Sequence, residues 1–302
     1  MRYRHLLLLS VIVLAVLAGY LASVARQDDA SRRAQIAMDE SLVAEMDPTA
    51  LPLPATIIPP EAVTSPPATA DNIESVPVKI PILVYHSVKP YRIGETLIQR
   101  TYQVEPAVFE RQMRHLSEGG YDPIVPDDLA AYFQDGQALP PKPVMVTFDD
   151  GWENQFEYAR PILERYKIRA TFYVFPNPIG KDKRFMTWGQ LKDLLAAGMA
   201  IGCHSKTHPY LTRVADDRML ADQITGAKSR LEQELGVTIN SFCYPFGLHD
   251  QRVDDEVRRA GFTTARGLRN YVDFKRSDLL NLGGFIITDN FSRFTQILGE
   301  GN

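Results

Sequence analysis

Two short motifs contain the side chains that a hydrolytic metal site needs. The first, TFDDG at 147–151, carries the adjacent carboxylates Asp149 and Asp150, and the second, HSKTHP at 204–209, carries His204 and His208. An anionic oxygen and two neutral imidazoles can hold a divalent metal ion, and a second carboxylate can take a proton from water. Each motif alone has a simpler explanation, a loop or helix cap for the aspartates and a chance helical spacing for the histidines. Together they predict a hydrolase.

Both motifs follow predicted strands. Residues 143–148 form an apolar run that ends at TFDDG, and residues 199–203 form a shorter one that ends at His204. Side chains at the carboxyl ends of parallel strands face a ligand cleft. The sequence therefore predicts that the two motifs meet at one edge of a sheet.

Strand and helix patterns alternate along the rest of the chain, which favours parallel βα units. The predicted strands are 79–85, 143–148, 170–175, 199–203, 241–244, 263–266 and 282–287, and the predicted helices are 106–119, 126–136, 152–166, 187–198, 216–235, 250–260 and 291–298. Thr187 and Gln190 form a capping-box pattern at the start of one helix. The fold class is therefore α/β.

TFDDG followed by HSKTHP resembles the first two motifs of the polysaccharide deacetylases, carbohydrate esterase family 4. The resemblance implies a distorted (β/α) barrel that removes acetyl groups from polysaccharides with one divalent metal. It also implies that Asp150, His204 and His208 hold the metal and that Asp149 is the general base. Zinc is the expected metal, although mixed nitrogen and oxygen ligands also suit cobalt, nickel or iron.

The general acid is expected from an unusual position. In the commonest family pattern a late leucine-and-histidine motif supplies it, but the late strand here, LNLGGFIITDN at 280–290, has no histidine. His86, in VYHSV at the end of the first predicted strand, is the best candidate. This placement resembles the subset that deacetylates biofilm poly-N-acetylglucosamine, in which an N-terminal Tyr-His supplies the acid. The alternative for His86 is a hydrogen-bonded core histidine.

The third family motif, R-x-P-Y/F, usually begins with an arginine that hydrogen-bonds the base. Here the segment reads CYPF at 243–246, so the sequence predicts that this arginine is absent. The Phe246 N–H could still stabilise an oxyanion. Trp188, Tyr244 and Phe246 could line a sugar site, and core packing is their alternative role.

The two cysteines, Cys203 and Cys243, end neighbouring predicted strands. We expect buried free thiols rather than a disulfide, and a metal-ligand role for Cys203 is the least favoured option.

The N-terminus predicts export. Arg2 and Arg4 precede an uncharged stretch, Leu6 to Ala25, that is long enough to cross a bilayer. It is either an uncleaved anchor or a signal peptide that ends at Ser23-Val24-Ala25. The expected domains are the membrane segment 1–25, a polar and Pro-rich linker 26–78, and the catalytic domain 79–302. The catalytic domain would then lie outside the cytoplasmic membrane, anchored or secreted.

The composition is that of a globular protein, with 302 residues, 45% of them hydrophobic and 23% charged. A net charge of −4 without a basic stripe argues against a nucleic-acid partner. The predicted function is N-deacetylation of an N-acetylglucosamine polysaccharide, with poly-β-1,6-N-acetylglucosamine favoured. The alternatives are a peptidoglycan or chitin deacetylase, an O-acetyl-glycan esterase and, least favoured, an inactive carbohydrate-binding module. A polysaccharide synthase or export machinery is a candidate partner.

Overall fold

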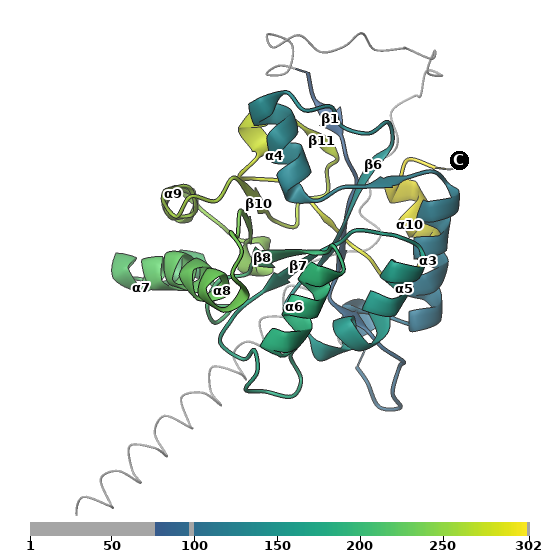
Figure 1. The fold of residues 1–302 in the computed structure, drawn as a ribbon, viewed down its shortest axis with the longest axis horizontal. Helices are drawn as coiled ribbons and strands as arrows, with labels where there is room; N and C mark the ends of the chain where they lie inside the picture. The colour runs from purple at the N-terminus through teal and green to yellow at the C-terminus, as the bar shows by residue number, and fades with distance from the viewer. Residues whose placement is uncertain (1–75, 97–99, 301–302) are drawn as a thin grey trace, which may run out of the picture. The chain divides into compact units, whose positions relative to one another are not determined.

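The computed structural model describes residues 76–96 and 100–300 (Figure 1). The predicted membrane segment 1–25 and nearly all of the linker lie outside these residues, so both stay predictions. None of the helices in the described ranges combines the length and the apolar character that a bilayer crossing needs.

A curled parallel sheet forms the centre of the fold. Its strands run in the order β10-β9-β8-β7-β6-β2-β12, and each neighbouring pair is parallel. The strands are β2 (Ile82–Tyr85), β6 (Pro143–Phe148), β7 (Thr171–Val174), β8 (Ala200–Cys203), β9 (Ser241–Cys243), β10 (Thr264–Arg266) and β12 (Phe285–Ile286). The two ends of this order approach each other where Arg266, in β10, bridges to Leu282, just before β12.

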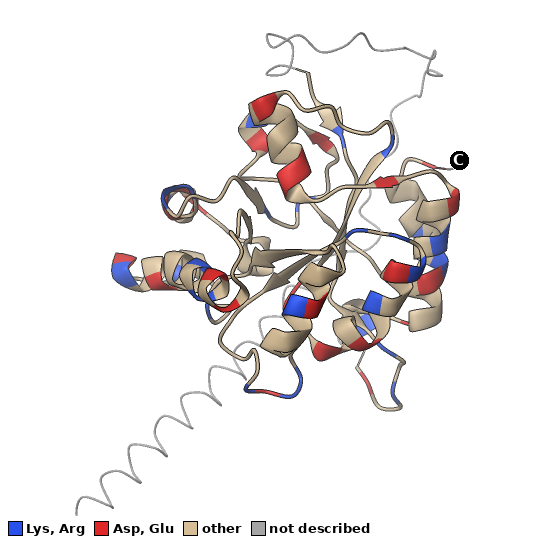
Figure 2. Cartoon of the chain, viewed as in Figure 1, with Lys and Arg blue, Asp and Glu red and all other residues tan. Residues whose placement is uncertain are grey.

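The strands β2 and β7 are buried along their whole length, and helices cover the sheet (Figure 1). The helices are α3 (Pro106–Glu118), α4 (Pro126–Asp135), α5 (Arg160–Arg165), α6 (Trp188–Ala196), α7 (Asp217–Ala221), α8 (Ala227–Leu235), α9 (Gln251–Arg259) and α10 (Phe291–Ile297). The predicted capping box opens α6, with the Gln190 N–H donating to Thr187 Oγ1. Figure 2 shows charges of both signs interspersed on these helices.

Two predicted helices contain π-helical turns. Residues 155–159 precede α5 as a π-helical turn, and residues 222–226 join α7 to α8 in the same way. Such turns often occur at functional sites. The first of them carries Gln155, whose side chain donates to two backbone carbonyls of the candidate site described next.

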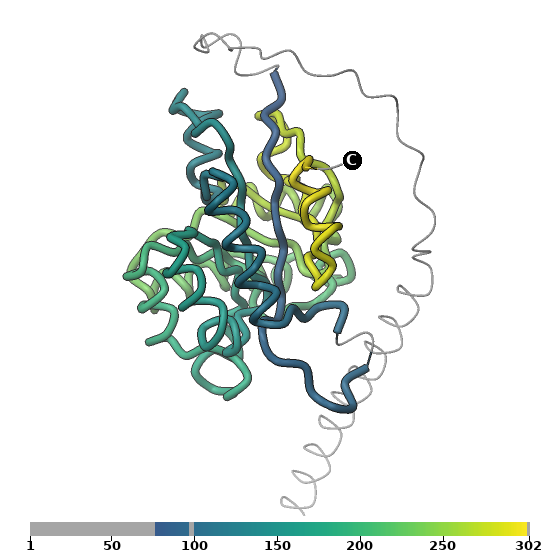
Figure 3. The backbone as a smooth tube through the Cα atoms, turned by 90° about the vertical axis from the view of Figure 1, so that its right-hand side faces the viewer, coloured from purple at the N-terminus to yellow at the C-terminus, as the bar shows by residue number. Residues whose placement is uncertain are grey.

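Two predicted strands are shorter than expected. The first breaks at Pro81 into β1 (Val78–Lys79), which pairs antiparallel with β11 (Asp273–Phe274), and β2. The last shrinks to β12 because Gly283 packs so closely that a Cβ there would lie 2.4 Å from the Arg269 carbonyl oxygen. Figure 3 shows the first described strands beside the C-terminal segment, as these pairings require.

Three short strands had no sequence signal. β3 (Ser87–Val88) pairs in parallel with β4 (Gln103–Val104), and β5 (Asp122–Pro123) joins β6. The β3–β4 pair lies immediately after His86, so it extends the fold at the candidate site.

Candidate active site

The functional motifs meet at the carboxyl edge of the sheet. Asp149 and Asp150 follow β6, His204 follows β8, and His86 follows β2, which is the direct neighbour of β6. Because these strands are parallel, the residues that follow them emerge at the same edge. The sequence placed each of them correctly relative to its strand.

Asp150, His204 and His208 converge as a ligand set. The Asp150 Oδ1 atom lies 3.6 Å from His204 Nε2 and 3.6 Å from His208 Nε2. The remaining polar atoms of two ligands are already engaged, since Trp152 Nε1 donates to Asp150 Oδ2 at 2.9 Å and His204 Nδ1 lies 2.8 Å from the Cys243 carbonyl oxygen. With Nδ1 donating to that carbonyl, the lone pair of His204 Nε2 faces Asp150.

This donor set fits a divalent metal. Ligand atoms about 2.0–2.1 Å from a tetrahedral zinc lie about 3.3 Å apart, close to the two spacings found here. Burial, above all, lowers the pKa of both His204 and His208 to about 4, so both rings are neutral at pH 7. Neutral imidazoles and a carboxylate suit zinc and several other transition metals, so the ligands do not identify the metal.

Strained backbone is concentrated around these ligands. Among the described residues, five non-glycine residues have a positive φ, and four of them belong to this edge: Asp150, Ser205, His208 and Phe246, with φ of 76°, 61°, 58° and 60°. Such conformations persist only where the surrounding structure holds them, and they cluster at functional sites. Ser205 Oγ accepts from the His208 N–H at 3.0 Å, so Ser205 helps to orient His208.

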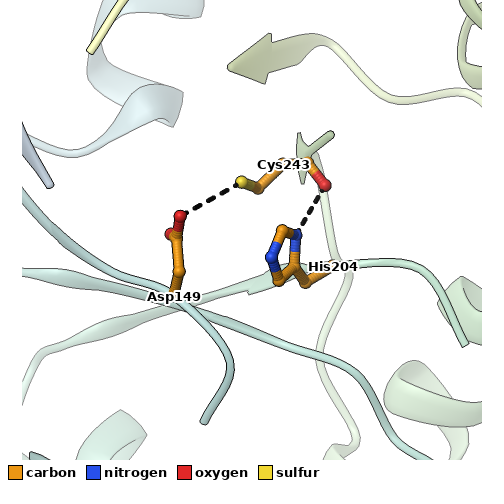
Figure 4. A group of neighbouring side chains, drawn as sticks. All are labelled: Asp149, His204 and Cys243. Carbon is orange, nitrogen blue, oxygen red and sulfur yellow. Dashed lines mark hydrogen bonds between the residues drawn. The ribbon is translucent and has the colours of Figure 1, made fainter. Parts of the chain in front are cut away.

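Asp149 is buried and pairs with an arginine. Its side chain is 3% exposed, and Arg266 Nη2 donates to its Oδ1. The same Nη2 lies 3.1 Å from Cys243 Sγ, which in turn lies 3.6 Å from Asp149 Oδ2 (Figure 4). The arginine of the third motif is absent, as predicted, but the base still has an arginine partner. The partner comes from β10, one strand beyond its usual place, and it lies against the short side chain of Cys243.

The ion pair fixes the charge of Asp149. Burial alone would raise the pKa of Asp149, but the Arg266 guanidinium, with His204 and His86, lowers it to about 2. Asp149 is therefore an ionised carboxylate at neutral pH. Burial acts to lower the pKa of Arg266, and Asp149 outweighs it and raises that pKa.

His86 lies beside this carboxylate. Its Nε2 is 3.9 Å from Asp149 Oδ2, and its side chain is 15% exposed. Gln155 Nε2 donates to the carbonyl oxygens of both His86 and Asp149, at 2.5 Å each, which ties the two strand ends together. His86 Nδ1 is buried and has no hydrogen-bond partner among the described residues. The alternative of a hydrogen-bonded core histidine finds no support at that nitrogen.

The predicted sugar-lining aromatics differ in their placement. Tyr244 is 1% exposed, its hydroxyl donates to the Leu280 carbonyl and its ring stacks on His249, which favours its alternative role of core packing. Phe246 is half-buried, with its ring centroid 4.5 Å from that of His208. Trp188 packs against the main core, and its role at a sugar stays a prediction.

Both cysteines are free and buried, which confirms the prediction of free thiols. Burial raises the pKa of Cys203 to about 12 and also raises that of Cys243, so neither is a reactive thiolate. Asp149, His204 and Cys243 also lie close enough together to be considered as metal ligands. The Arg266 guanidinium contacts both Asp149 Oδ1 and Cys243 Sγ, and its positive charge argues against a cation in that place.

Comparisons with known proteins agree with these motifs. A family model for polysaccharide deacetylases matches residues 136–265, which include TFDDG and HSKTHP. A Bacillus subtilis protein that bears the name polysaccharide deacetylase YxkH is 25% identical over 186 residues, 62% of this chain and 63% of that protein. The poly-β-1,6-N-acetyl-D-glucosamine N-deacetylase of Staphylococcus aureus is 24% identical over 174 residues, 54% of this chain and 60% of that protein.

The fold has a counterpart among solved structures. The Streptococcus pyogenes deacetylase PplD, solved in complex with acetate, matches with a TM-score of 0.67 at 23% identity, over 74% of this chain and 99% of that chain. At this identity the likeness shows the fold. The chain spans less than two thirds of the length of the two curated relatives described above.

Proposed function

We propose that the chain is a polysaccharide deacetylase of carbohydrate esterase family 4, as the family model over residues 136–265 supports, and that it removes N-acetyl groups from an N-acetylglucosamine polysaccharide. One observation carries the proposal. A metal-ligand set, an ionised carboxylate and a histidine come from three strand ends to one edge of the sheet. Hydrolysis of an amide needs these three functions: a polarised carbonyl, a base for water and an acid for the amine.

Each of these three functions is assigned to particular residues in our proposal. Asp150, His204 and His208 would hold a divalent cation, most simply zinc, which when bound polarises the acetamide carbonyl and acidifies water. Asp149 takes a proton from the attacking water. The oxyanion that forms accepts a hydrogen bond from the Phe246 N–H. His86 donates a proton to the glucosamine nitrogen as the C–N bond breaks, so that acetate and a free amine leave.

Arg266 has a defined place in this scheme. Its guanidinium keeps Asp149 ionised in a buried position. Without that counter-charge, burial would dominate and raise the pKa of the carboxylate. We infer that Arg266 positions the base rather than touching the substrate.

Poly-β-1,6-N-acetylglucosamine is the substrate we favour. The Staphylococcus aureus relative bears the name of a deacetylase for this polymer, and the acid histidine lies near the start of the domain here, at the place expected for that subset. The test is acetate release from β-1,6-linked oligomers beside chitin oligomers, peptidoglycan and acetylated xylan. Turnover confined to xylan or to simple acetate esters would replace the proposal with an O-acetyl esterase.

We expect the His86→Ala variant to separate amide from ester cleavage. An amine must be protonated before it departs, whereas a nitrophenolate leaves unassisted. Deacetylation of N-acetylglucosamine oligomers should therefore fall by about 10²–10⁴, while cleavage of a nitrophenyl acetate changes by less than about tenfold. Metal content, measured on the same samples, should stay at the wild-type level. Unchanged amide turnover would remove His86 from the mechanism, and equal loss on both substrates would make its role structural.

We also propose that the domain works outside the cytoplasmic membrane, held there or exported by the apolar segment at residues 6–25, with a polysaccharide synthase or export machinery as its partner. The support is the basic N-terminus followed by that segment. Protease added to cells with a permeabilised outer layer should degrade the catalytic domain. Protection equal to that of a cytoplasmic marker would contradict the proposal.

A further inference from the structure

Tyr102 presents an exposed aromatic ring beside His86. Among the described residues it is the one aromatic side chain that is both large and exposed, at 37%. Its ring centroid lies 4.9 Å from that of His86, with the two planes at 63°. A partly exposed aromatic side chain next to a proposed catalytic histidine can contact a ligand that binds there.

The backbone holds Tyr102 in this place. The β3–β4 connection is described at residues 89–96 and 100–102, and the pairing of the two strands places Tyr102 beside His86. The Ser87 N–H donates to the Tyr102 carbonyl oxygen at 3.0 Å. Asn154 Oδ1 accepts from the Val88 N–H at 2.9 Å and from Ser87 Oγ at 3.2 Å. The attachment point of the Tyr102 ring is thus fixed directly to the segment that follows His86.

Hydrogen bonds of Tyr91 also hold the β3–β4 connection in place. Tyr91 donates through its hydroxyl to Asp289 Oδ2 at 2.7 Å and through its N–H to Glu105 Oε1 at 2.6 Å. Asp289 Oδ1 in turn accepts from the Glu105 N–H at 3.0 Å. These bonds hold Tyr91 and Glu105, which lie on either side of Tyr102 in the sequence, in fixed positions.

We propose that Tyr102 contacts the glycan and that its ring packs against a pyranose ring of the bound polysaccharide. This inference rests on the proposed function. A glycan that presents its acetamide nitrogen to His86 must pass beside Tyr102, because the two rings are in contact. The C–H face of a pyranose is apolar, and a rigid, partly exposed aromatic ring covers such a face at low entropic cost. No sequence pattern pointed to this residue, since its closeness to His86 depends on the β3–β4 pairing.

The test separates glycan contact from simple support of His86. Steady-state kinetics are measured for Tyr102→Ala and Tyr102→Phe with β-1,6-linked N-acetylglucosamine oligomers and with nitrophenyl acetate. For Tyr102→Ala we expect KM on the oligomers to rise by about tenfold with kcat within about twofold, and no change on the ester. Tyr102→Phe keeps the ring and should behave as wild type. Ile93→Ala, a change at a fully exposed side chain of the same β3–β4 connection, is the matched control and should leave KM and kcat unchanged.

Two outcomes overturn the inference. The first is an unchanged KM with a lower kcat in Tyr102→Ala, which would mean that the ring only positions His86. The second is an unchanged KM with an unchanged kcat, which would mean that the ring does not contribute to glycan turnover at all. Melting temperature and metal content accompany each variant. If Tyr102→Ala does not fold, Tyr102→Leu keeps the apolar bulk without the flat ring and is expected to show the same rise in KM.

Binding without turnover keeps this inference independent of the proposed function. The full-length wild type and Tyr102→Ala are treated with a chelator, and calorimetry measures the Kd for the same oligomers. A Kd about tenfold weaker in the variant supports the contact, and equal values refute it. If the metal-loaded wild type releases no acetate from any N-acetylglucosamine polymer, the proposed function fails, while this comparison still decides the role of Tyr102.

Discussion

Replacing Asp150, His204 or His208 with alanine will abolish both metal retention and acetate release while leaving the fold intact. The three side chains form one set, with Asp150 Oδ1 at 3.6 Å from a ring nitrogen of each histidine. Loss of an outer hydrogen-bond partner typically weakens a metal site by about 10–100-fold, and loss of a direct ligand weakens it further. None of the three replacements opens the main core, since Asp150 and His208 are partly exposed and His204 lies at the end of β8.

The measurement is elemental analysis of purified, full-length variants together with their melting temperatures. His115→Ala is the matched control, because His115 lies on α3 and pairs with Glu300 outside the site. It should retain metal at the wild-type level. Full metal occupancy in any one of the three ligand variants would remove that residue from the set. Loss of metal from His115→Ala as well would show that the measurement does not distinguish the ligands from other residues.

The position of each site residue at the end of its own strand could be predicted from the sequence. Asp149 and Asp150 directly follow an apolar strand, and His204 does the same, so the parallel order of β6, β7 and β8 was enough to bring them together. The placement of His86 followed in the same way, because β2 pairs with β6. In each case the local pattern of apolar residues fixes where the strand ends, and the strand end fixes the position of the side chain.

Contacts between motifs could not be predicted. Arg266 reaches Asp149 across 117 residues of sequence, and the contact depends on β10 lying next to β9 and on the small side chain at Cys243. A strand that ends in a buried arginine was a usable signal, because a buried guanidinium requires a partner charge. Tyr244 was expected at the substrate, but its side chain points away from the site. Neighbouring side chains point to opposite faces of a strand, so with Cys243 facing Asp149 its neighbour Tyr244 faces His249.

Because Asp149 pairs with Arg266, replacing Asp149 should lower both turnover and stability. We expect Asp149→Asn to lower acetate release by about 10²–10⁴, because an amide cannot take the proton of water. It should retain the metal, since Asp150, His204 and His208 are unchanged. It should also lower the free energy of unfolding by about 3 kcal/mol, because it leaves the fully buried Arg266 guanidinium without its counter-charge. The melting temperature should then fall by about 6–12 °C.

A double variant separates these two effects. Asp149→Asn combined with Arg266→Met removes both charges and fills the buried space with an unbranched apolar side chain, a replacement that is often neutral for buried ion pairs. We expect the double variant to regain most of the stability lost by Asp149→Asn while its turnover stays as low. Arg266→Met alone should lose stability and activity together, because Asp149 is then buried without a partner and its pKa rises. Thermal unfolding and acetate release, measured on all four proteins at equal metal content, complete the cycle. Recovery of turnover along with stability in the double variant would mean that Asp149 supports the fold and that another group takes the proton.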